Sequence, residues 1–433
     1  MPLFAAPSSS KVDPKASFWL TPKARILFAH PDARKPARLL ARALREKWIV
    51  GGDFKAPAIP VRAGKKGKNA IVLRRGSPGK ESKNEEAFRL SVTTGGVTLV
   101  ARSAAGLRFA SQALAEHFDP AGFFPGGRIA DAPTHAFRSL LIHLTHYDPV
   151  WYRRKRFEKR IDPGVTERVI RAAAAARFNH LIIDVADGVR YRSHPELARP
   201  YSIRMAGFRK LVRLARSLGM EVIPKLNFAK SFGKHHHNAW MRPYNTLPDD
   251  EAYYRHAFAL MGELVRVVRP RYFHIGMDED EAHTHAGYVE KVRRLNAWLR
   301  AREIRTIQWI DLGKRYQKKI EKKMRAAVGR LPKDVILTHW QYHGRIFDWV
   351  AWIRARGYKV LCGTGGRKGG FEAIRAFAQR AAAQGAMGMI STHWVPLQRK
   401  WEAEILASVE ASGRAYWQGG YEGGAWSRSA PTR

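Results

Sequence analysis

The chain has 433 residues, 45% of them apolar and 26% charged, which is a globular composition with room for two domains. No apolar run approaches the roughly 20 residues that a membrane helix needs, and a single cysteine, Cys362, excludes an internal disulfide and a cysteine-based zinc cage. Lysine and arginine total 77 against 37 acids, a net charge of +40 that favours polyanions such as an acidic glycan. These basic residues are spread along the sequence without a nucleic-acid-binding motif, so we expect no specific nucleic-acid partner.

The N-terminal residues 1–25 are rich in Ser, Pro and Lys and predict a disordered lead-in. Their first ten residues, MPLFAAPSSS, contain no basic leader and no apolar segment long enough for a signal peptide. The sequence as given therefore carries no export signal, and export or a periplasmic location is expected only if the true start lies upstream. Localisation and oligomeric state stay open.

Residues 26–134 predict a small α+β domain that ends in a linker. Its clearest element is a β-hairpin, because two alternating segments flank the turn Thr94-Gly95-Gly96. An alanine-rich helix follows the hairpin, and repeated Pro and Gly then indicate the linker. The expected elements are strands at 24–29, 70–74, 87–92 and 97–101, helices at 36–48 and 103–117, and the linker at 119–134.

Residues 135–433 predict a (β/α)8 TIM barrel, because eight short apolar runs alternate with amphipathic segments. A doubly wound sheet is the competing fold, but it usually carries a glycine-rich phosphate turn after its first strand, and LLIHLTH at 140–146 contains no glycine. The expected strands are 138–144, 180–185, 220–225, 271–276, 305–310, 335–340, 358–362 and 386–392. The expected helices are 163–177, 206–218, 251–268, 286–303, 314–328, 345–356, 370–384 and 398–412.

A TIM barrel places its catalytic residues at the carboxyl ends of the strands. The fourth strand ends in HIGMDEDE at 274–281. Glycine at 276 permits the strand to break there, so that Asp278 and Glu279 can reach one pocket. Neighbouring carboxylates raise each other's proton affinity, and a protonated acid beside an ionised one can cleave a glycosidic bond.

The same acids also fit a purely structural role. Asp and Glu directly before the helix expected at 286–303 would suit the dipole of that helix. Their place at the end of a barrel strand favours the catalytic interpretation over this one.

The segment FHIGMDED at 273–280 resembles the His-x-Gly-Gly-Asp-Glu hallmark of glycoside hydrolase family 20. Other segments are similar to that family in the same order, and the resemblance covers about residues 85–395. Only the Asp-Glu segment is specific, and the rest is a general barrel pattern. The similar segments are 86–131, including SAAGLRFASQALAEHF, then Phe178-Asn179-His180-Leu181, Asp187, Ser193-His194-Pro195-Glu196-Leu197 and Met220-Glu221-Val222-Ile223-Pro224.

The resemblance implies a retaining β-N-acetylhexosaminidase, in which the 2-acetamido oxygen of the sugar attacks its own anomeric carbon. Carried over, Glu279 is the general acid/base that protonates the leaving oxygen. Asp278 orients the acetamide and stabilises its developing charge. Trp309, Trp340 and Trp394, each at an expected strand end, form aromatic walls around the N-acetyl group, with packing at the barrel rim as their alternative role.

The remaining substrate contacts implied by the resemblance are Asp187, His274, His146 and Tyr342. His146 stands where the family carries an Arg for sugar hydroxyls, and Tyr342 is the candidate for a Tyr that the family places after its seventh strand. Both are departures from the family pattern.

Three further segments depart from that pattern. Met277 replaces the second glycine of the hallmark and narrows the pocket, and His143 stands where an Asp is expected. Residues 224–227 read Pro-Lys-Leu-Asn where the family has Pro-Glu-Ile-Asp. These changes indicate either an unusual substrate or a loss of activity.

Two other functions stay open beside the glycosidase. A non-catalytic carbohydrate or polyanion binder would explain the lost sugar contacts and the charge. A metal-dependent hydrolase would use histidines and aspartates near strand ends, but the usual His-x-His pair of its first strand is absent, so we expect no metal and no cofactor. The residues considered for such a metal are His143, His146, His274, His339, His393, Asp184, Asp187 and Asp278.

Overall fold

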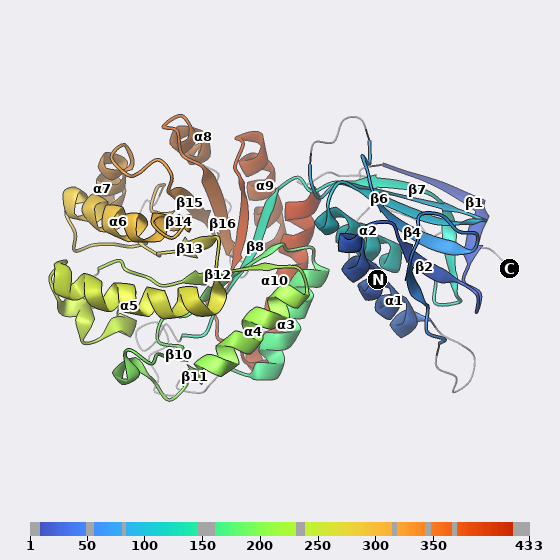
Figure 1. The fold of residues 1–433 in the computed structure, drawn as a ribbon. Helices are drawn as coiled ribbons and strands as arrows, with labels where there is room; N and C mark the ends of the chain where they lie inside the picture. Colours follow the sequence, from blue (N-terminus) through green and yellow to red (C-terminus); the bar gives the residue numbers. More distant parts are fainter. Residues whose placement is uncertain are drawn as a thin grey trace. The chain divides into compact units, whose positions relative to one another are not determined.

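The structure is a computed structural model, and it divides the chain into two compact units with a boundary between Ala136 and Phe137 (Figure 1). Each unit is described by itself. No helix among the described residues is long and apolar enough to cross a membrane. The described residues are 9–48, 56–79, 84–145, 161–230, 239–313, 318–342, 348–365 and 370–418.

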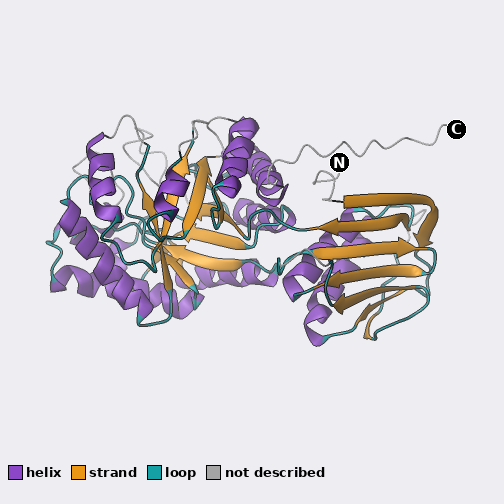
Figure 2. Cartoon of the chain, turned by 90° about the horizontal axis from the view of Figure 1, so that it is seen from above, coloured by secondary structure: helices purple, strands orange, loops and turns teal. Residues whose placement is uncertain are grey.

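The N-terminal unit is a seven-stranded sheet in the order β1-β7-β5-β6-β4-β2-β3, with helices α1 and α2 packed against it (Figure 2). The predicted hairpin is β5 and β6, which pair antiparallel. The elements are β1 Ser9–Trp19, β2 Arg25–Phe28, α1 Arg34–Lys47, β3 Val61–Ala63, β4 Ala70–Arg75, β5 Phe88–Thr93, β6 Gly96–Ala101, α2 Ala104–Glu116 and β7 Phe123–Asp131.

Two segments of this unit differ from the sequence predictions. Residues 1–25 were expected to be disordered, yet Ser9–Trp19 forms β1, and the expected linker 119–134 contains β7. The two strands pair antiparallel, and each offers hydrogen-bond partners to the backbone of the other. This pairing joins distant segments, so local composition does not predict it. Pro125 lies where the register shifts between Asp13 and Phe18, a bulge that tolerates a residue without an N–H donor.

The second unit is a closed barrel of eight parallel strands in the order β12-β13-β14-β15-β16-β17-β8-β9, surrounded by helices. This confirms the predicted TIM barrel. The barrel strands are β8 Phe137–His143, β9 His180–Asp184, β12 Glu221–Lys225, β13 Tyr272–His274, β14 Arg305–Ile310, β15 Ile336–Gln341, β16 Val360–Gly365 and β17 Gly388–Thr392. The helices are α3 Pro163–Ala175, α4 Met205–Ser217, α5 Glu251–Val268, α6 His285–Arg300, α7 Lys318–Val328, α8 Trp349–Arg354, α9 Gly370–Ala383 and α10 Arg399–Gln418.

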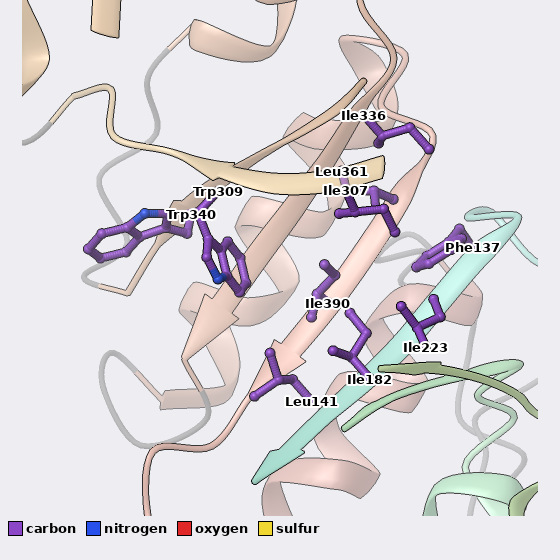
Figure 3. Packing of buried hydrophobic residues seen from close by; sticks show 10 residues of the cluster. All are labelled: Phe137, Leu141, Ile182, Ile223, Ile307, Trp309, Ile336, Trp340, Leu361 and Ile390. Carbon is purple, nitrogen blue, oxygen red and sulfur yellow. The ribbon is translucent and has the colours of Figure 1, made fainter. Parts of the chain in front are cut away.

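The inside of the barrel is filled by buried apolar side chains from seven of its strands (Figure 3), and partly buried Tyr272 of β13 packs against them. Phe137 lies at the amino end of its strand, and Trp309 and Trp340 lie near the carboxyl ends of β14 and β15. Because the interior is packed, a substrate can meet only the strand ends and the loops that follow them. The cluster comprises Phe137, Leu141, Ile182, Ile223, Ile307, Trp309, Ile336, Trp340, Leu361 and Ile390.

Candidate active site

The acidic segment after β13 is an irregular turn rather than a continuation of the strand. Its backbone has positive φ at Gly276 (73°), Met277 (75°) and Glu279 (52°). Gly276 is required there, because a Cβ atom would lie 2.3 Å from Oδ1 of Asn227. A left-handed conformation at the other two residues costs about 1–3 kcal/mol each, a strain that is typical of functional sites.

Asn227, directly after β12, holds this turn from one side. Its Nδ2 donates to Oδ1 of Asp278 at 2.8 Å, and its own Oδ1 accepts the backbone N–H of Met277 at 3.0 Å. The same oxygen accepts the N–H of Ala229 at 3.1 Å. Asn227 is buried. Its amide positions the Asp278 carboxylate and also holds the backbone of Met277, which has a positive φ.

Asp311, directly after β14, holds the turn from the other side. Its Oδ2 accepts the backbone N–H of Glu279 at 2.8 Å, and its Oδ1 accepts the indole N–H of Trp340 at 3.0 Å. The residue is fully buried. Asp311 therefore connects the backbone of the expected acid/base to one of the expected aromatic walls.

Aromatic side chains continue from Trp340 around the barrel end. The ring of Tyr342 lies 4.9 Å from that of Trp340, and the Tyr342 hydroxyl accepts the indole N–H of Trp394 at 2.8 Å. The ring of His143 lies 5.4 Å from Trp394. Burial raises the pKa of Tyr342, and the negative charges of Asp278 and Glu279 raise that pKa further, so the phenol stays protonated as a donor.

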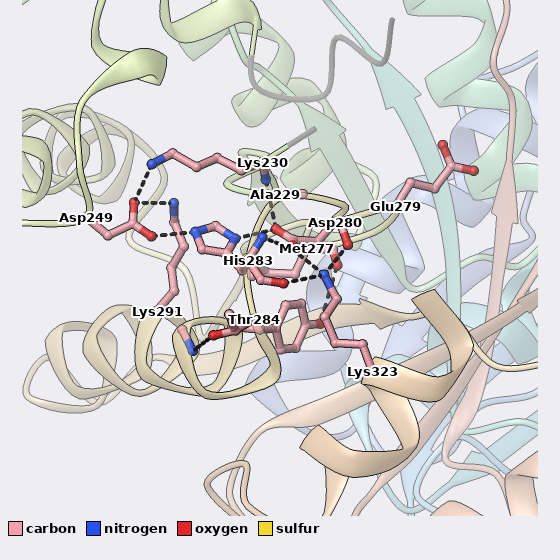
Figure 4. Close-up of polar contacts among 12 residues, drawn as sticks. Ala229, Lys230, Asp249, Met277, Glu279, Asp280, His283, Thr284, Lys291 and Lys323 are labelled. Carbon is pink, nitrogen blue, oxygen red and sulfur yellow. Dashed lines mark hydrogen bonds and ion pairs between the residues drawn. The ribbon is translucent and has the colours of Figure 1, made fainter. Parts of the chain in front are cut away.

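The opposite face of the turn is an ion-pair network (Figure 4). Asp280 accepts from the Lys323 ammonium at 2.7 Å and contacts Nδ1 of His283 at 2.6 Å, while Nε2 of His283 lies 2.5 Å from Asp249. Lys291 donates to Asp249 at 2.9 Å. The Glu279 side chain points away from this network, so neighbouring acids of one turn face different surroundings.

Opposite charges within the network shift the pKa values of Asp280 and His283 against the effect of burial. Burial works to raise the pKa of Asp280, but His283 and Lys323 lower it to about 2. Burial works to lower the pKa of His283, but its bonds to Asp249 and Asp280 outweigh burial and raise that pKa. The contacts within the network therefore favour the charged forms of both Asp280 and His283.

The structural alternative for the acidic segment does not match the start of α6. The N-cap of that helix is Thr284, whose hydroxyl accepts the N–H of Gly287 at 3.1 Å, and its first turn contains no acidic residue. Residues 278–281 lie before the cap. Their positions are set by partners across the barrel end rather than by the helix dipole.

His274 and Trp309 lie beneath the turn. His274 is fully buried, its Nδ1 accepts the N–H of Gly276 at 3.0 Å, and its ring lies 4.8 Å from Trp309. Burial and the charge of Lys225 lower the pKa of His274 well below its usual range, so the ring is neutral. In this position His274 supports the turn, and a direct contact with substrate stays a prediction.

Asp187 lies in a second group, in the loop between β9 and the short strand β10 (Val189–Arg190). Its carboxylate accepts the hydroxyl of Thr145 at 2.5 Å and the Nε–H of Arg199 at 3.4 Å. Burial raises the pKa of Asp187, and these donors oppose that rise. His146, the other residue expected here, lies outside the described residues.

The residues considered for a metal, apart from His146, which is not described, do not form a ligand set. Among the described parts of the chain, no group of three His, Cys, Asp or Glu residues is placed to hold a metal ion. Asp184 instead forms a fully buried ion pair with Lys225, with 2.6 Å between Oδ2 and Nζ. Burial, together with the nearby His143, lowers the pKa of His393 to about 4, so that ring is neutral as well.

The structure therefore places four of the expected residues in one connected arc and adds two that sequence reasoning missed. Glu279, Asp311, Trp340, Tyr342 and Trp394 follow one another through direct contacts. Asp311 and the amide role of Asn227 were not predicted. Their signal was available, because each lies just after the end of a barrel strand, where site residues are expected.

Comparison with known proteins agrees with this architecture. Residues 2–132 match the sequence profile described as glycosyl hydrolase family 20, domain 2. The resemblance to glycoside hydrolase family 20 is confirmed. No curated protein matches the chain in sequence.

Solved structures of family 20 share the fold over nearly the whole chain. The β-N-acetylhexosaminidase of Streptomyces coelicolor A3(2) has a TM-score of 0.70 at 19% identity, covering 96% of this chain and 92% of its own. The Flavobacterium johnsoniae chitobiase has a TM-score of 0.72 at 18% identity, covering 95% and 68%. The Vibrio harveyi exo β-N-acetylglucosaminidase, solved with N-acetylglucosamine, has a TM-score of 0.70 at 14% identity, covering 96% and 73%. At these identities the structures establish the fold.

Proposed function

We propose that the protein is a retaining glycoside hydrolase that acts on 2-acetamido sugars. The observation that carries the proposal is the turn after β13, where Asp278 and Glu279 are fixed by Asn227 and Asp311 at the end of the barrel. Two carboxylates beside an aromatic arc supply an acid, a charge stabiliser and walls for a sugar. The natural substrate is a glycan, and the charge of +40 favours an anionic one.

In the proposed reaction, Glu279 gives a proton to the leaving glycosidic oxygen and later takes one from water. The acetamido oxygen of the substrate bonds to the anomeric carbon as the leaving group departs. Asp278, oriented by Asn227, stabilises the positive charge that develops on the acetamide nitrogen. Tyr342, protonated and next to Trp394, can donate to the acetamide oxygen. Trp340 is held by Asp311 as one wall of the pocket.

The test compares aryl 2-acetamido-2-deoxy-β-glycosides with plain aryl β-glycosides, for wild type and Glu279→Gln. We expect release only from the acetamido sugars, with a rate that falls on the order of 10²–10⁴-fold in the variant. Turnover of plain glycosides alone would contradict the acetamide-assisted mechanism.

A carbohydrate or polyanion binder on the same barrel is the second candidate. Two observations favour it. At the barrel end the carboxylate of Asp184 is taken up by an ion pair with Lys225, and the residue beside Asp278 is the neutral Asn227 rather than an acid. A folded protein that binds the acetamido sugars without cleaving them would establish this candidate and exclude the hydrolase.

A further inference from the structure

A pocket away from the proposed active site lies between helices α5 and α6. It has a volume of about 520 Å³. Its floor is apolar, with Phe258 and Trp298 among the lining residues, and three arginines belong to the lining as well. The residues on which the inference depends are Arg255, Phe258, Gly262, Arg266, Trp298 and Arg302.

The charge of this pocket is positive. Arg255 and Arg266 are eleven residues apart on α5, about three helical turns, and therefore lie on one face. Among the described residues that line the pocket, none is acidic. The neighbouring acid, Glu263, is buried and accepts the backbone N–H groups of residues 192–193 at 2.9 and 2.6 Å. Against the effect of burial, these hydrogen bonds and the nearby charge of Arg266 lower the pKa of Glu263, and the three arginines outnumber this carboxylate. An anion would therefore be attracted to the three arginines.

One of these guanidinium groups is held in place before any ligand arrives. The rings of Phe258 and Trp298 are stacked at 5.3 Å with an angle of 7° between them. Cζ of Arg302 lies 3.7 Å from the Trp298 ring centroid, and its Nη1 donates to the Trp298 carbonyl at 2.8 Å. A guanidinium carries five N–H donors, so this arrangement fixes the group and leaves other donors for an anion.

Gly262 keeps the space between the arginines open. It lies inside the 18-residue helix α5, where glycine is disfavoured relative to alanine. A Cβ atom there would lie 3.5 Å from Nη1 of Arg266 and 4.0 Å from Cζ2 of Trp298, which are ordinary contacts. Packing therefore does not demand glycine, whereas a longer side chain at this position would fill the pocket.

We propose that this pocket binds an organic anion, with its carboxylate, sulfate or phosphate on the arginines and its ring over the apolar floor. The volume exceeds that of a small inorganic ion, and the lining is mostly apolar, so the ligand needs an apolar body as well as a charge. An acidic sugar and an aromatic acid share this chemistry. The proposal does not depend on the glycosidase activity.

The test measures binding by calorimetry at about 150 mM salt, where long-range attraction to the net charge is screened. The probes are a glucuronate-bearing disaccharide, phenyl sulfate and inorganic sulfate. Gly262→Leu fills the pocket without changing any charge, and Arg302→Gln removes one guanidinium. Arg213→Gln, on the exposed face of α4, is the control with the same change in charge.

We expect at least one organic probe to bind, with its affinity reduced roughly tenfold or more by Gly262→Leu and by Arg302→Gln and unchanged by Arg213→Gln. Tighter binding of the glucuronate-bearing disaccharide indicates that the natural ligand is an acidic sugar. Tighter binding of phenyl sulfate indicates an aromatic acid. An equal loss in all three variants, binding of inorganic sulfate as tight as that of the organic probes, or no binding of either organic probe would each overturn the proposal. Because Arg302 is exposed, its variant tests the site even if Gly262→Leu does not fold.

Discussion

The two faces of the turn after β13 hold their acids in different ways. On one face, Asp278 accepts from the neutral amide of Asn227, and Glu279 is anchored through its backbone N–H. On the other face, Asp280 is paired with His283 and Lys323. A carboxylate paired with cations in a buried network fixes geometry. The amide of Asn227 places the Asp278 carboxylate at the barrel end through a neutral hydrogen bond. Adjacent acids can thus divide into chemical and structural roles.

Removing the negative charge of Asp280 should destabilise the protein strongly. Asp280→Asn removes the carboxylate partner of Lys323 and leaves His283 with Asp249 alone, and breaking such a buried pair costs about 3–5 kcal/mol of the free energy of unfolding. Urea denaturation measures this loss. Glu251→Gln, which removes an exposed ion pair with Arg294, is the control and should cost about 1 kcal/mol or less. Equal losses would remove the distinction between buried and exposed pairs.

The isosteric change on the other face should act on rate instead. Asp278→Asn keeps an oxygen for the Asn227 amide but removes the charge that stabilises the reacting acetamide. We expect kcat on an aryl 2-acetamido glycoside to fall about 10²–10³-fold with little change in Tm. Glu281→Gln makes the same chemical change at an exposed position of the segment and should leave kcat unaltered. A matching loss there would show that the loop's total charge, not Asp278, matters.

Asp311 should contribute through position rather than through contact with substrate. In Asp311→Asn only one oxygen remains to accept from both the Glu279 N–H and the Trp340 indole, and the unsatisfied donor costs about 1–3 kcal/mol. We expect kcat/KM to fall roughly tenfold or more.

A double-mutant cycle with Trp340→Phe isolates this positioning role. That substitution removes the indole N–H, so the single acceptor of the Asp311→Asn variant can serve Glu279 again. The double variant should lose less activity than the sum of the two single variants, with a coupling of about 0.5–3 kcal/mol. Strict additivity would contradict the proposed connection between the two residues.

The network should also give stability a pH dependence with two limbs. The raised pKa of His283 adds stability below its unfolded value of about 6.5, and this stability is lost as pH rises through the folded pKa. The pKa of Asp280, lowered to about 2, adds stability above its unfolded value near 3.8, which is lost as pH falls toward 2. Urea unfolding of wild type and His283→Gln should therefore differ most between about pH 4 and 6.5. A constant difference from pH 4 to 9 would contradict this assignment.

Most of the fold could be predicted from the sequence because the barrel repeats one pattern. Short apolar runs marked the strands, and alternation with amphipathic segments indicated the parallel closed sheet. The failures were local. Ser9–Trp19 is too polar, and Phe123–Asp131 too rich in glycine and proline, to be recognised as strands from local composition. β1 takes its backbone partner from β7, and β7 pairs with both β1 and β5.

For the site, the sequence could predict only which residue types lie at the ends of the barrel strands. The sequence indicated Asp278 and Glu279, but it could not separate them from Asp280, because that difference depends on cations contributed by distant segments. Likewise, Asn227 looked like a lost family residue. The structure shows that its amide makes two of the hydrogen bonds that hold the turn, to Asp278 and to the N–H of Met277.

We propose that the turn after β13 cleaves 2-acetamido glycosides with participation of the acetamide. The stereochemistry of the released product tests this proposal most directly. Proton NMR of the first product released from an aryl 2-acetamido-2-deoxy-β-glycoside reports the anomer before mutarotation. We predict the β anomer, because attack by the acetamide followed by water gives net retention. Release of the α anomer, or no release by the folded protein, would contradict the claim.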